Sequence, residues 1–360
     1  MPLLRPRFDL TVCPWTAENP RNDHQLIFPL TETRLLLVWS EYYANSPRLV
    51  ERTPFDTIGG FADQAPCRIT GKFSDDEGRT WSPRFTMQEN LWGLNVKHPN
   101  LIRVSDTEIL FTFTAWQSEQ GERNVFQKRS LDNGQTWGEI VQISEPGWYC
   151  TNNDHALRLS SGRILLPSHG GPGFVYRGRK SKLHSFVFYS DDDGQTWRLS
   201  EDTMTAPGRG CHEPSIVELQ DGRLLCFMRT TQERIYRSYS EDQGVHWTTP
   251  EPTELPAPDS PPLLKTIAGT TDLLLVWNHV ASERNQPRTP LTAAISRDEG
   301  ASWEHIQDVD NQEDHDSAYA AATFVGDEVL LTYYTRPDYW SRDTEVRLKI
   351  YSVGQLYGSG

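Results

Sequence analysis

The sequence predicts an all-β protein, and within that class a six-bladed β-propeller, from three observations. An eight-residue motif with the pattern S-x-D-x-G-x-x-W occurs five times at nearly even spacing. Short apolar runs that follow a turn residue occur six times with a similar period. Helical periodicity is weak throughout the 360 residues. Units of roughly 50–60 residues with about four short strands each are typical of propeller blades.

The eight-residue motif has the chemistry of a hairpin turn. Its third position is aspartate in every copy, with steps of 56, 60, 50 and 56 residues between Asp76, Asp132, Asp192, Asp242 and Asp298. Aspartate can accept a hydrogen bond from the backbone one or two residues ahead, and glycine supplies the positive φ of a tight turn. We expect the closing tryptophan to cap the next strand and to pack sideways.

Strand patterns precede and follow these turns. Residues 185–189 and 291–295 are alternating or continuous apolar segments directly before two copies of the motif, as in a β-strand. The six apolar runs predict an inner, doubly buried strand in each unit. They are centred on Leu36, Leu110, Leu165, Leu225, Leu274 and Leu330.

The organisation is that of one domain. No break in composition divides the chain, so we expect residues 1–360 to form a single propeller domain. The sixth unit lacks the motif, which is expected for a blade closed by strands from both chain ends.

Composition excludes several classes of protein. A hydrophobic fraction of 36% with 11% aromatic residues excludes global disorder. No apolar run approaches the ~18 residues of a spanning helix, so no membrane insertion is expected. The formal charge of 35 − 49 = −14 argues against nucleic acid or an anionic membrane as a partner.

Targeting and cofactor signals are also informative. The N-terminal residues lack the apolar stretch of a secretory signal, so the expected location is cytoplasmic, with a trimmed secreted form as the alternative. The five cysteines are odd in number and show no CxxC pair, as expected of buried or free thiols. No glycine-rich phosphate loop occurs, and no HExxH or H-x-x-x-H pattern, so neither cofactor nor metal is expected. The sequence does not set the oligomeric state.

Candidate site residues lie beside the inner strands. In a propeller the pocket forms where these strands and their loops converge on the axis, so polar residues just before or after each inner strand are the candidates. We expect most of them to line one pocket. They are Arg21, Asp63, His98, Asp154, His155, His169, His212, Glu213, Arg229, Arg288 and Tyr319.

With its repeated Asp-box, the sequence resembles the sialidase (neuraminidase) superfamily over nearly its whole length. The resemblance implies an exo-acting glycoside hydrolase that removes a terminal acidic sugar, sialic acid or a related one, from glycans. It implies an anionic carbohydrate as substrate. The boxes are fold markers in that superfamily, so we assign them no catalytic role. Because fold alone does not define function, the site residues need their own argument.

The resemblance also implies roles for six residues. Arg21, Arg229 and Arg288 correspond by position to three arginines that hold the substrate carboxylate, although the Ile-Pro that follows the first of them in the family is absent here. Guanidinium groups bind carboxylates through paired, charge-assisted hydrogen bonds. The resemblance further makes Tyr319 the nucleophile, Glu213 its activating partner and Asp63 the general acid/base, for which a raised pKa would be needed. Each also has a structural interpretation, such as a buried Arg229–Glu213 ion pair or a core position for Tyr319.

The histidines leave a second enzymatic hypothesis open. His155, His169, His212 and His98 lie beside the inner strands of three neighbouring units, which a sialidase pocket does not require. Ulvan-type polysaccharide lyases, which are similar propellers, use His and Tyr as acid and base and an Arg that neutralises a uronate. Here His155 or His169 would abstract the proton, His212 would stand in place of the Tyr, and Arg229 would hold the uronate. A third hypothesis is a non-catalytic glycan-binding propeller.

Overall fold

β-strands dominate the computed structural model, which describes residues 1–44, 63, 65–91, 93–117, 121–175, 181–282, 288–313, 315–337 and 343–358. Within these ranges the assigned helix is the short α2 (Val353–Leu356). The all-β prediction is therefore confirmed. No helix in the described ranges is long and apolar enough to cross a membrane.

The strands form five hydrogen-bonded sheets, four of which have four strands. In the order of their hydrogen bonding, the first contains β2 (Arg21–Pro29), β3 (Leu35–Tyr42), β4 (Cys67–Ser74) and β5 (Phe85–Gln88). Another contains β15 (His212–Glu218), β16 (Leu224–Arg229), β17 (Arg234–Ser240) and β18 (Glu251–Pro256). The next contains β19 (Leu263–Thr266), β20 (Leu273–Asn278), β21 (Leu291–Ser296) and β22 (Glu304–Asp310). The last contains β1 (Phe8–Cys13), β25 (Glu345–Ser352), β24 (Glu328–Arg336) and β23 (Asp316–Val325).

The fifth sheet has nine strands and consists of two antiparallel halves. One half contains β6 (Asn95–Arg103), β7 (Ile109–Trp116), β8 (Arg123–Ser130) and β9 (Val141–Gln142). The other contains β10 (Gly147–Thr151), β11 (Leu157–Arg158), β12 (Ile164–Pro172), β13 (Ser185–Ser190) and β14 (Arg198–Leu199). The halves meet at one parallel residue pair, Trp148 with Arg123.

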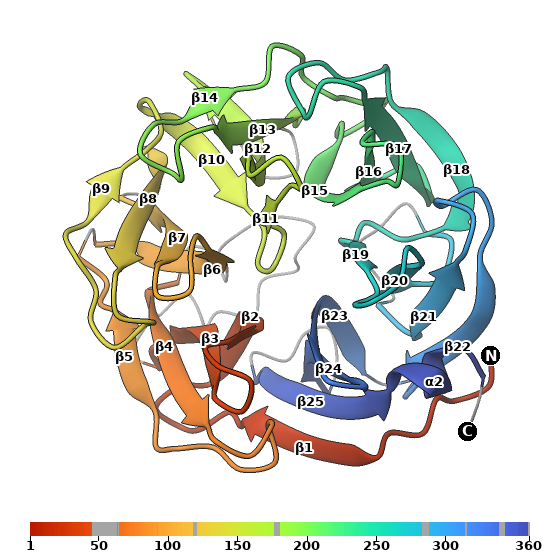
Figure 1. Ribbon diagram of the computed structural model, residues 1–360, viewed down its shortest axis with the longest axis horizontal. Helices are drawn as coiled ribbons and strands as arrows, with labels where there is room; N and C mark the ends of the chain where they lie inside the picture. The colour runs from red at the N-terminus through yellow and green to blue at the C-terminus, as the bar shows by residue number, and fades with distance from the viewer. Residues whose placement is uncertain are drawn as a thin grey trace.

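The sheets are arranged around a common centre, with β2, β6, β11, β15, β19 and β23 nearest to it (Figure 1). The strand after each of these is hydrogen-bonded on both sides and is buried on both faces. These second strands, β3, β7, β12, β16, β20 and β24, carry the predicted centres Leu36, Leu110, Leu165, Leu225, Leu274 and Leu330, all 1% exposed or less. The prediction of a doubly buried strand in each unit is confirmed.

The two ends of the chain close the last sheet. Strand β1 pairs antiparallel with β25, beginning with Phe8 opposite Ile350, so the N-terminal segment supplies the outer strand of a sheet whose other strands are C-terminal (Figure 1). The sequence predicted this closure from the missing sixth motif.

Each Asp-box is a turn held by its own side chains. In the first box the Ser74 hydroxyl accepts a hydrogen bond from the Gly78 N–H at 2.9 Å, and Asp76 Oδ1 accepts one from Thr80 N at 2.8 Å. We predicted that the aspartate accepts a hydrogen bond from a backbone N–H one or two residues ahead, and this was wrong. The aspartate instead accepts from the N–H of the fourth residue ahead, across the whole turn. The Trp81 indole donates to the Gly78 carbonyl at 3.0 Å. The other boxes repeat the serine and aspartate contacts.

The box glycines fit against the preceding sheet. Gly194 has a φ of +77°, and a Cβ there would lie 2.3 Å from Leu110 Cδ1 in the other half of the nine-stranded sheet. In the first box, a Cβ on Gly78 would lie 2.9 Å from Leu330 of the last sheet. Glycine is required at both positions by conformation and by space. The contact of the first box with the last sheet closes the arrangement.

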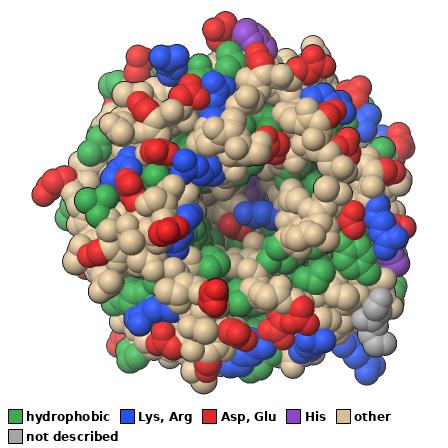
Figure 2. All heavy atoms as spheres, in the orientation of Figure 1, with side chains coloured by type: hydrophobic (Ala, Val, Ile, Leu, Met, Phe, Trp, Pro, Cys, Tyr) green, Lys and Arg blue, Asp and Glu red, His purple; other side chains and the backbone are tan. Residues whose placement is uncertain are grey.

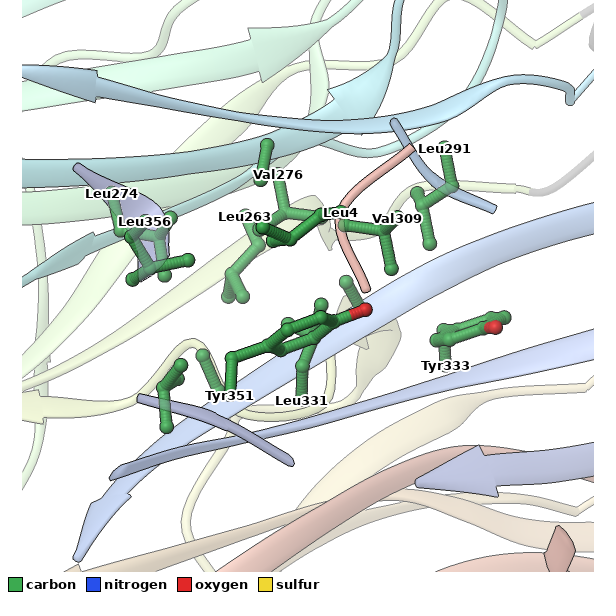
Figure 3. Close-up of a cluster of buried hydrophobic side chains, with 14 of the residues drawn as sticks. Leu4, Leu263, Leu274, Val276, Leu291, Val309, Leu331, Tyr333, Tyr351 and Leu356 are labelled. Atoms are coloured by element: carbon green, nitrogen blue, oxygen red, sulfur yellow. The ribbon is translucent and has the colours of Figure 1, made fainter. Parts of the chain in front are cut away.

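An apolar cluster fixes the last two sheets relative to each other. It includes Leu274, Leu291, Leu331 and Tyr351, and Leu4 from the N-terminal segment packs among them (Figure 3). These side chains are at most 4% exposed. Arg288 precedes β21 and Tyr319 lies within β23, so this packing positions the two strands that carry these candidate residues. All five cysteines are buried and unpaired.

Candidate functional site

The same backbone irregularity recurs on four of the strands nearest the centre and in the turn that precedes β11. His24, His98, Asp154, Glu213 and Tyr319 have φ between 50° and 60°, a conformation uncommon for residues other than glycine. In these four strands the pairing with the next strand shifts register at that residue. Such β-bulges re-aim a side chain, and left-handed non-glycine residues concentrate at functional sites. The bulges bring side chains from different sheets together.

Tyr319 and Glu213 meet directly, although they come from different sheets. The Tyr319 hydroxyl donates to Glu213 Oε1 at 2.7 Å and accepts a hydrogen bond from Arg229 Nη1 at 3.2 Å. Arg229 Nη1 also donates to Glu213 Oε2 at 2.6 Å. The phenol is thus hydrogen-bonded to both a proton acceptor and a cation.

A buried aspartate fixes the Arg229 guanidinium from its other side. Asp259, which lies just before β19, accepts from Arg229 Nε at 2.6 Å and from His212 Nε2 at 3.0 Å. Arg209 Nη1 lies 3.4 Å from the second oxygen of Asp259. This carboxylate is completely buried and orients the arginine and the histidine together.

Arg288, which precedes β21 of the neighbouring sheet, lies close to the same tyrosine. Its Cζ lies 5.5 Å from the centre of the Tyr319 ring. Its Nη1 donates to the Tyr334 hydroxyl at 2.6 Å, and its Nη2 donates to the Asp259 carbonyl at 3.3 Å. Tyr334 in turn donates to Asp316 at 3.0 Å. Arg229 and Arg288 therefore flank one phenol.

Arg21 and Asp63 form a second part of the site. Arg21 donates to Asp23 at 2.6 Å and to Asp63 Oδ1 at 3.0 Å, and it lies over the ring of Tyr42 at 4.4 Å. Asp23 also accepts from His24 Nδ1 at 2.5 Å. The His24 ring lies 4.7 Å from the Tyr319 ring, which connects this part with the tyrosine.

Two of the arginines keep a terminal nitrogen without a protein partner. Within the described part of the chain, neither Arg21 Nη1 nor Arg229 Nη2 makes a hydrogen bond, and neither is fully enclosed. Their other nitrogens are held by carboxylates. Each guanidinium is thus fixed in orientation and retains donors for an anionic ligand.

The predicted histidines have different surroundings. His169 Nδ1 accepts from the Glu213 N–H at 3.2 Å, and its ring contacts that of His212 at 5.7 Å. The His98 ring contacts His24 at 4.3 Å. His155 Nδ1 donates to the Pro214 carbonyl at 2.9 Å, while its Nε2 is engaged by Asn152. His155 therefore supports the bulge at Glu213 and stands apart from the tyrosine.

Asp154 makes a separate set of contacts. Its carboxylate binds Lys265 Nζ at 2.9 Å and accepts from the Ala322 N–H at 3.0 Å, so it ties three sheets together. Asp154, His155 and Lys265 line a cavity of about 320 Å³ between the central strands. Figure 2 shows the hollow at the centre of the molecule. No group of three or more His, Cys, Asp or Glu suited to a metal occurs among the described residues.

The charges of the site are set by burial and neighbours. Burial alone would raise the pKa of Glu213, but Arg229 holds it below its ordinary value. Burial would likewise raise the pKa of Asp63, but Lys97 and Arg21 hold it well below its usual range. Burial and the adjacent Glu213 raise the pKa of Tyr319 well above its ordinary value. With these shifts both carboxyls are ionised and the phenol is protonated at neutral pH.

We expect the buried histidines to make the protein lose stability in mild acid. Burial lowers the pKa of His155 to about 4 and, with Arg229, that of His212 to about 4, against about 6.5 unfolded. The unfolded chain then binds more protons below about pH 6.5, so stability falls as the pH drops from there to about 4. Thermal unfolding at a series of pH values in this range measures the loss of stability.

His155→Gln should flatten that decrease. The matched control is His246→Gln, because His246 is exposed and its hydrogen bond to Asp242 raises its pKa. Loss of that raised pKa removes stabilisation at low pH and cannot flatten the curve. An unchanged profile in His155→Gln would contradict the prediction.

Several site residues were missed at the sequence level. Asp259 and His24 complete the contacts of Arg229 and Tyr319. His24 occupies the same bulge position as His98, Glu213 and Tyr319, so aligning the central strands on one another would have found it. Asp259 carries no such signal.

The ring of small antiparallel sheets and the Asp-box turns define a β-propeller-type protein of the sialidase/BNR superfamily. Residues 69–331 match the family described as BNR repeat-like domain, and the chain belongs to this family.

Known relatives and structures agree with this assignment. The chain is similar to the sialidase of Micromonospora viridifaciens, 25% identical over 283 residues that cover 68% of this chain and 41% of the relative. It is similar to the sialidase of Clostridium perfringens, 23% identical over 220 residues, 53% of this chain and 54% of the relative. The matches thus span about half the length of these curated relatives.

Two solved structures show the fold over nearly the whole chain. A mutant of Trypanosoma rangeli sialidase displaying trans-sialidase activity has a TM-score of 0.74 at 17% identity, covering 99% of this chain and 60% of its own. A protein of unknown function from Dyadobacter fermentans has a TM-score of 0.71 at 16% identity, covering 97% of this chain and 99% of its own.

Proposed function

We propose that this protein is a sialidase-like exo-glycoside hydrolase that removes a terminal acidic sugar, sialic acid or a related one, from glycans. The observation that carries the proposal is the hydrogen bond of 2.7 Å between the Tyr319 hydroxyl and Glu213, flanked by Arg229 and Arg288. The sialidase relatives support it. We further propose that the fold is six-bladed, with the two halves of the nine-stranded sheet counted as separate blades.

Arg229 and Arg288, together with Arg21, would bind the carboxylate of the sugar. Tyr319 would then attack the anomeric carbon while Glu213 accepts the phenolic proton. The bond from the anomeric carbon to the leaving oxygen breaks, and that oxygen takes a proton from Asp63. In the second step Asp63 takes a proton from water, and the water oxygen attacks the anomeric carbon. The bond between that carbon and Tyr319 breaks, and the phenolate takes its proton back from Glu213. Two displacements give net retention of configuration.

The ion pair with Arg21 would keep Asp63 deprotonated until substrate arrives. A substrate carboxylate that binds Arg21 shares its positive charge, so the pKa of Asp63 rises in the complex. Binding of the anionic substrate would thereby prepare the proton donor. A tyrosine nucleophile suits this site because it places no second full anion against the sugar carboxylate.

The geometry gives less support to the lyase alternative. Both ring nitrogens of His155 are engaged, one by the Pro214 carbonyl and one by Asn152. His169 uses Nδ1 to accept from the Glu213 backbone. Neither arrangement presents a free basic nitrogen beside Arg229 in the way proton abstraction from a uronate requires.

An assay with two substrates separates the three hypotheses. We expect the protein to release the fluorophore from a 4-methylumbelliferyl glycoside of sialic acid and to produce no ultraviolet-absorbing unsaturated uronate from a uronate polymer. Unsaturated product would establish the lyase. Binding of the sugar with no turnover of either substrate would establish a non-catalytic glycan-binding protein.

A further inference from the structure

Arg123 is a buried cation for which the described part of the chain supplies no carboxylate. It begins β8 and is 3% exposed. Its Nε and Nη2 both lie 3.2 Å from Thr114 Oγ1, and Nη2 also donates to His98 Nδ1. By contrast, Arg21 and Arg229 each bind two carboxylates.

Aromatic rings surround this guanidinium but do not neutralise it. Arg123 Cζ lies 5.6 Å from the Trp116 ring centre and 5.2 Å from that of Trp148. Each cation–π contact stabilises the guanidinium by less than its desolvation costs. The effective desolvation penalty of a buried ion is several kcal/mol. A buried arginine that has only neutral partners is therefore expected to bind an anion, because the anion would neutralise its charge.

The cation lies beside the proposed catalytic residues. Its partner His98 contacts His24, and His24 contacts Tyr319. On the other side, His169 lies 5.9 Å from the same Trp148 ring and accepts from the Glu213 backbone. Two ring contacts, Tyr319 with His24 and His24 with His98, and one hydrogen bond from Arg123 to His98 therefore connect Tyr319 with Arg123.

Two hydrogen-bond donors remain available there. Within the described residues, Arg123 Nη1 makes no hydrogen bond and is not fully enclosed. His169 uses Nδ1 as an acceptor, so its neutral ring carries the proton on Nε2, which likewise has no described partner and is not fully enclosed. His98, an acceptor toward Arg123, orients the guanidinium.

We propose that Arg123 and His169 form a second anion subsite, which binds a carboxylate or sulfate substituent carried by the same acidic sugar. This inference rests on the proposed function for the identity of the ligand. The preferred substrate would be a doubly anionic sugar, with one group at Arg229 and Arg288 and the other at Arg123.

Calorimetric titration of the full chain with inorganic sulfate tests the subsite without relying on turnover. We expect wild type to bind sulfate at this subsite as well as at Arg229 and Arg288, and Arg123→Met to bind it at least about 10-fold more weakly at the subsite alone, a change of about 1.4 kcal/mol. Arg163→Met is the matched control, because Arg163 also lies over an aromatic ring, Tyr189, but is paired with Asp191. It should bind as wild type does.

Two further variants keep the test decisive. Arg288→Met, in the carboxylate part of the site, should retain the sulfate binding that depends on Arg123. If Arg123→Met does not fold, Arg123→Lys serves, and it should also weaken binding because an ammonium lacks the planar fork. The proposal is wrong if wild type does not bind sulfate at the subsite, or if the Arg123 variant that folds binds sulfate as tightly as wild type. It is also wrong if Arg288→Met abolishes sulfate binding at the subsite. Weak binding at several equivalent sites would indicate an adventitious ion only and would likewise contradict the proposal. If the protein hydrolyses a sialoside but does not bind sulfate at Arg123, the proposed function stands and the subsite proposal is wrong.

Discussion

Tyr319→Phe is expected to lower the kcat for sialoside hydrolysis by at least about 1,000-fold, because it removes the attacking oxygen while leaving the ring in place. Binding of the free acid sugar should change little, since Arg229 and Arg288 keep their other partners. The measurement is steady-state kinetics of the variant together with calorimetric binding of the product.

The matched control is Tyr333→Phe. Tyr333 is also a buried tyrosine whose hydroxyl donates to a carboxylate, Asp310, at 2.9 Å, but its ring packs in the apolar cluster between the last two sheets. The loss of one buried hydrogen bond costs about 1 kcal/mol in either variant. Comparable kcat values in the two variants would contradict a nucleophilic role for Tyr319.

Arg229→Met is expected to reduce the free energy of unfolding by about 3–5 kcal/mol and to abolish activity, because it leaves Glu213 and Asp259 buried without their cation. Both ion pairs measure 2.6 Å, and the Arg229 side chain is 6% exposed. Urea unfolding at neutral pH measures the change.

An exposed ion pair provides the comparison for this loss. Arg237 lies 2.8 Å from Glu251, with side chains 31% and 56% exposed. Arg237→Met should cost no more than about 1 kcal/mol, because solvent screens surface pairs. A loss in Arg229→Met as small as this would mean that the arginine does not hold the two carboxylates as the structure indicates.

The sequence predicted the fold because its evidence is local and repeated. An Asp-box is complete within eight residues, and each buried strand is a continuous apolar run, so neither depends on distant contacts. The count of six blades stays a prediction, because a parallel pair between Trp148 and Arg123 joins two of the predicted units into one nine-stranded sheet. The sequence contains no signal for that pair.

The site was predicted less completely, for a physical reason. Arg229, Glu213 and Tyr319 lie in or beside the inner strands, which made them candidates, and the structure brings their side chains into contact. Asp259 acts through contacts 30 and 47 residues away along the chain, with Arg229 and His212. Such long-range contacts, like the absence of an acid beside Arg123, depend on the packing of neighbouring sheets.

Mass spectrometry of a trapped intermediate tests the central claim most directly. The protein is incubated with 2,3-difluorosialic acid, whose fluorine beside the anomeric carbon slows breakdown of a glycosyl–enzyme bond, and is then quenched and digested. The account predicts a covalent sugar adduct on the peptide that contains Tyr319, absent from Tyr319→Phe. An adduct on a different residue, or continued turnover of a sialoside in Tyr319→Phe, would contradict it.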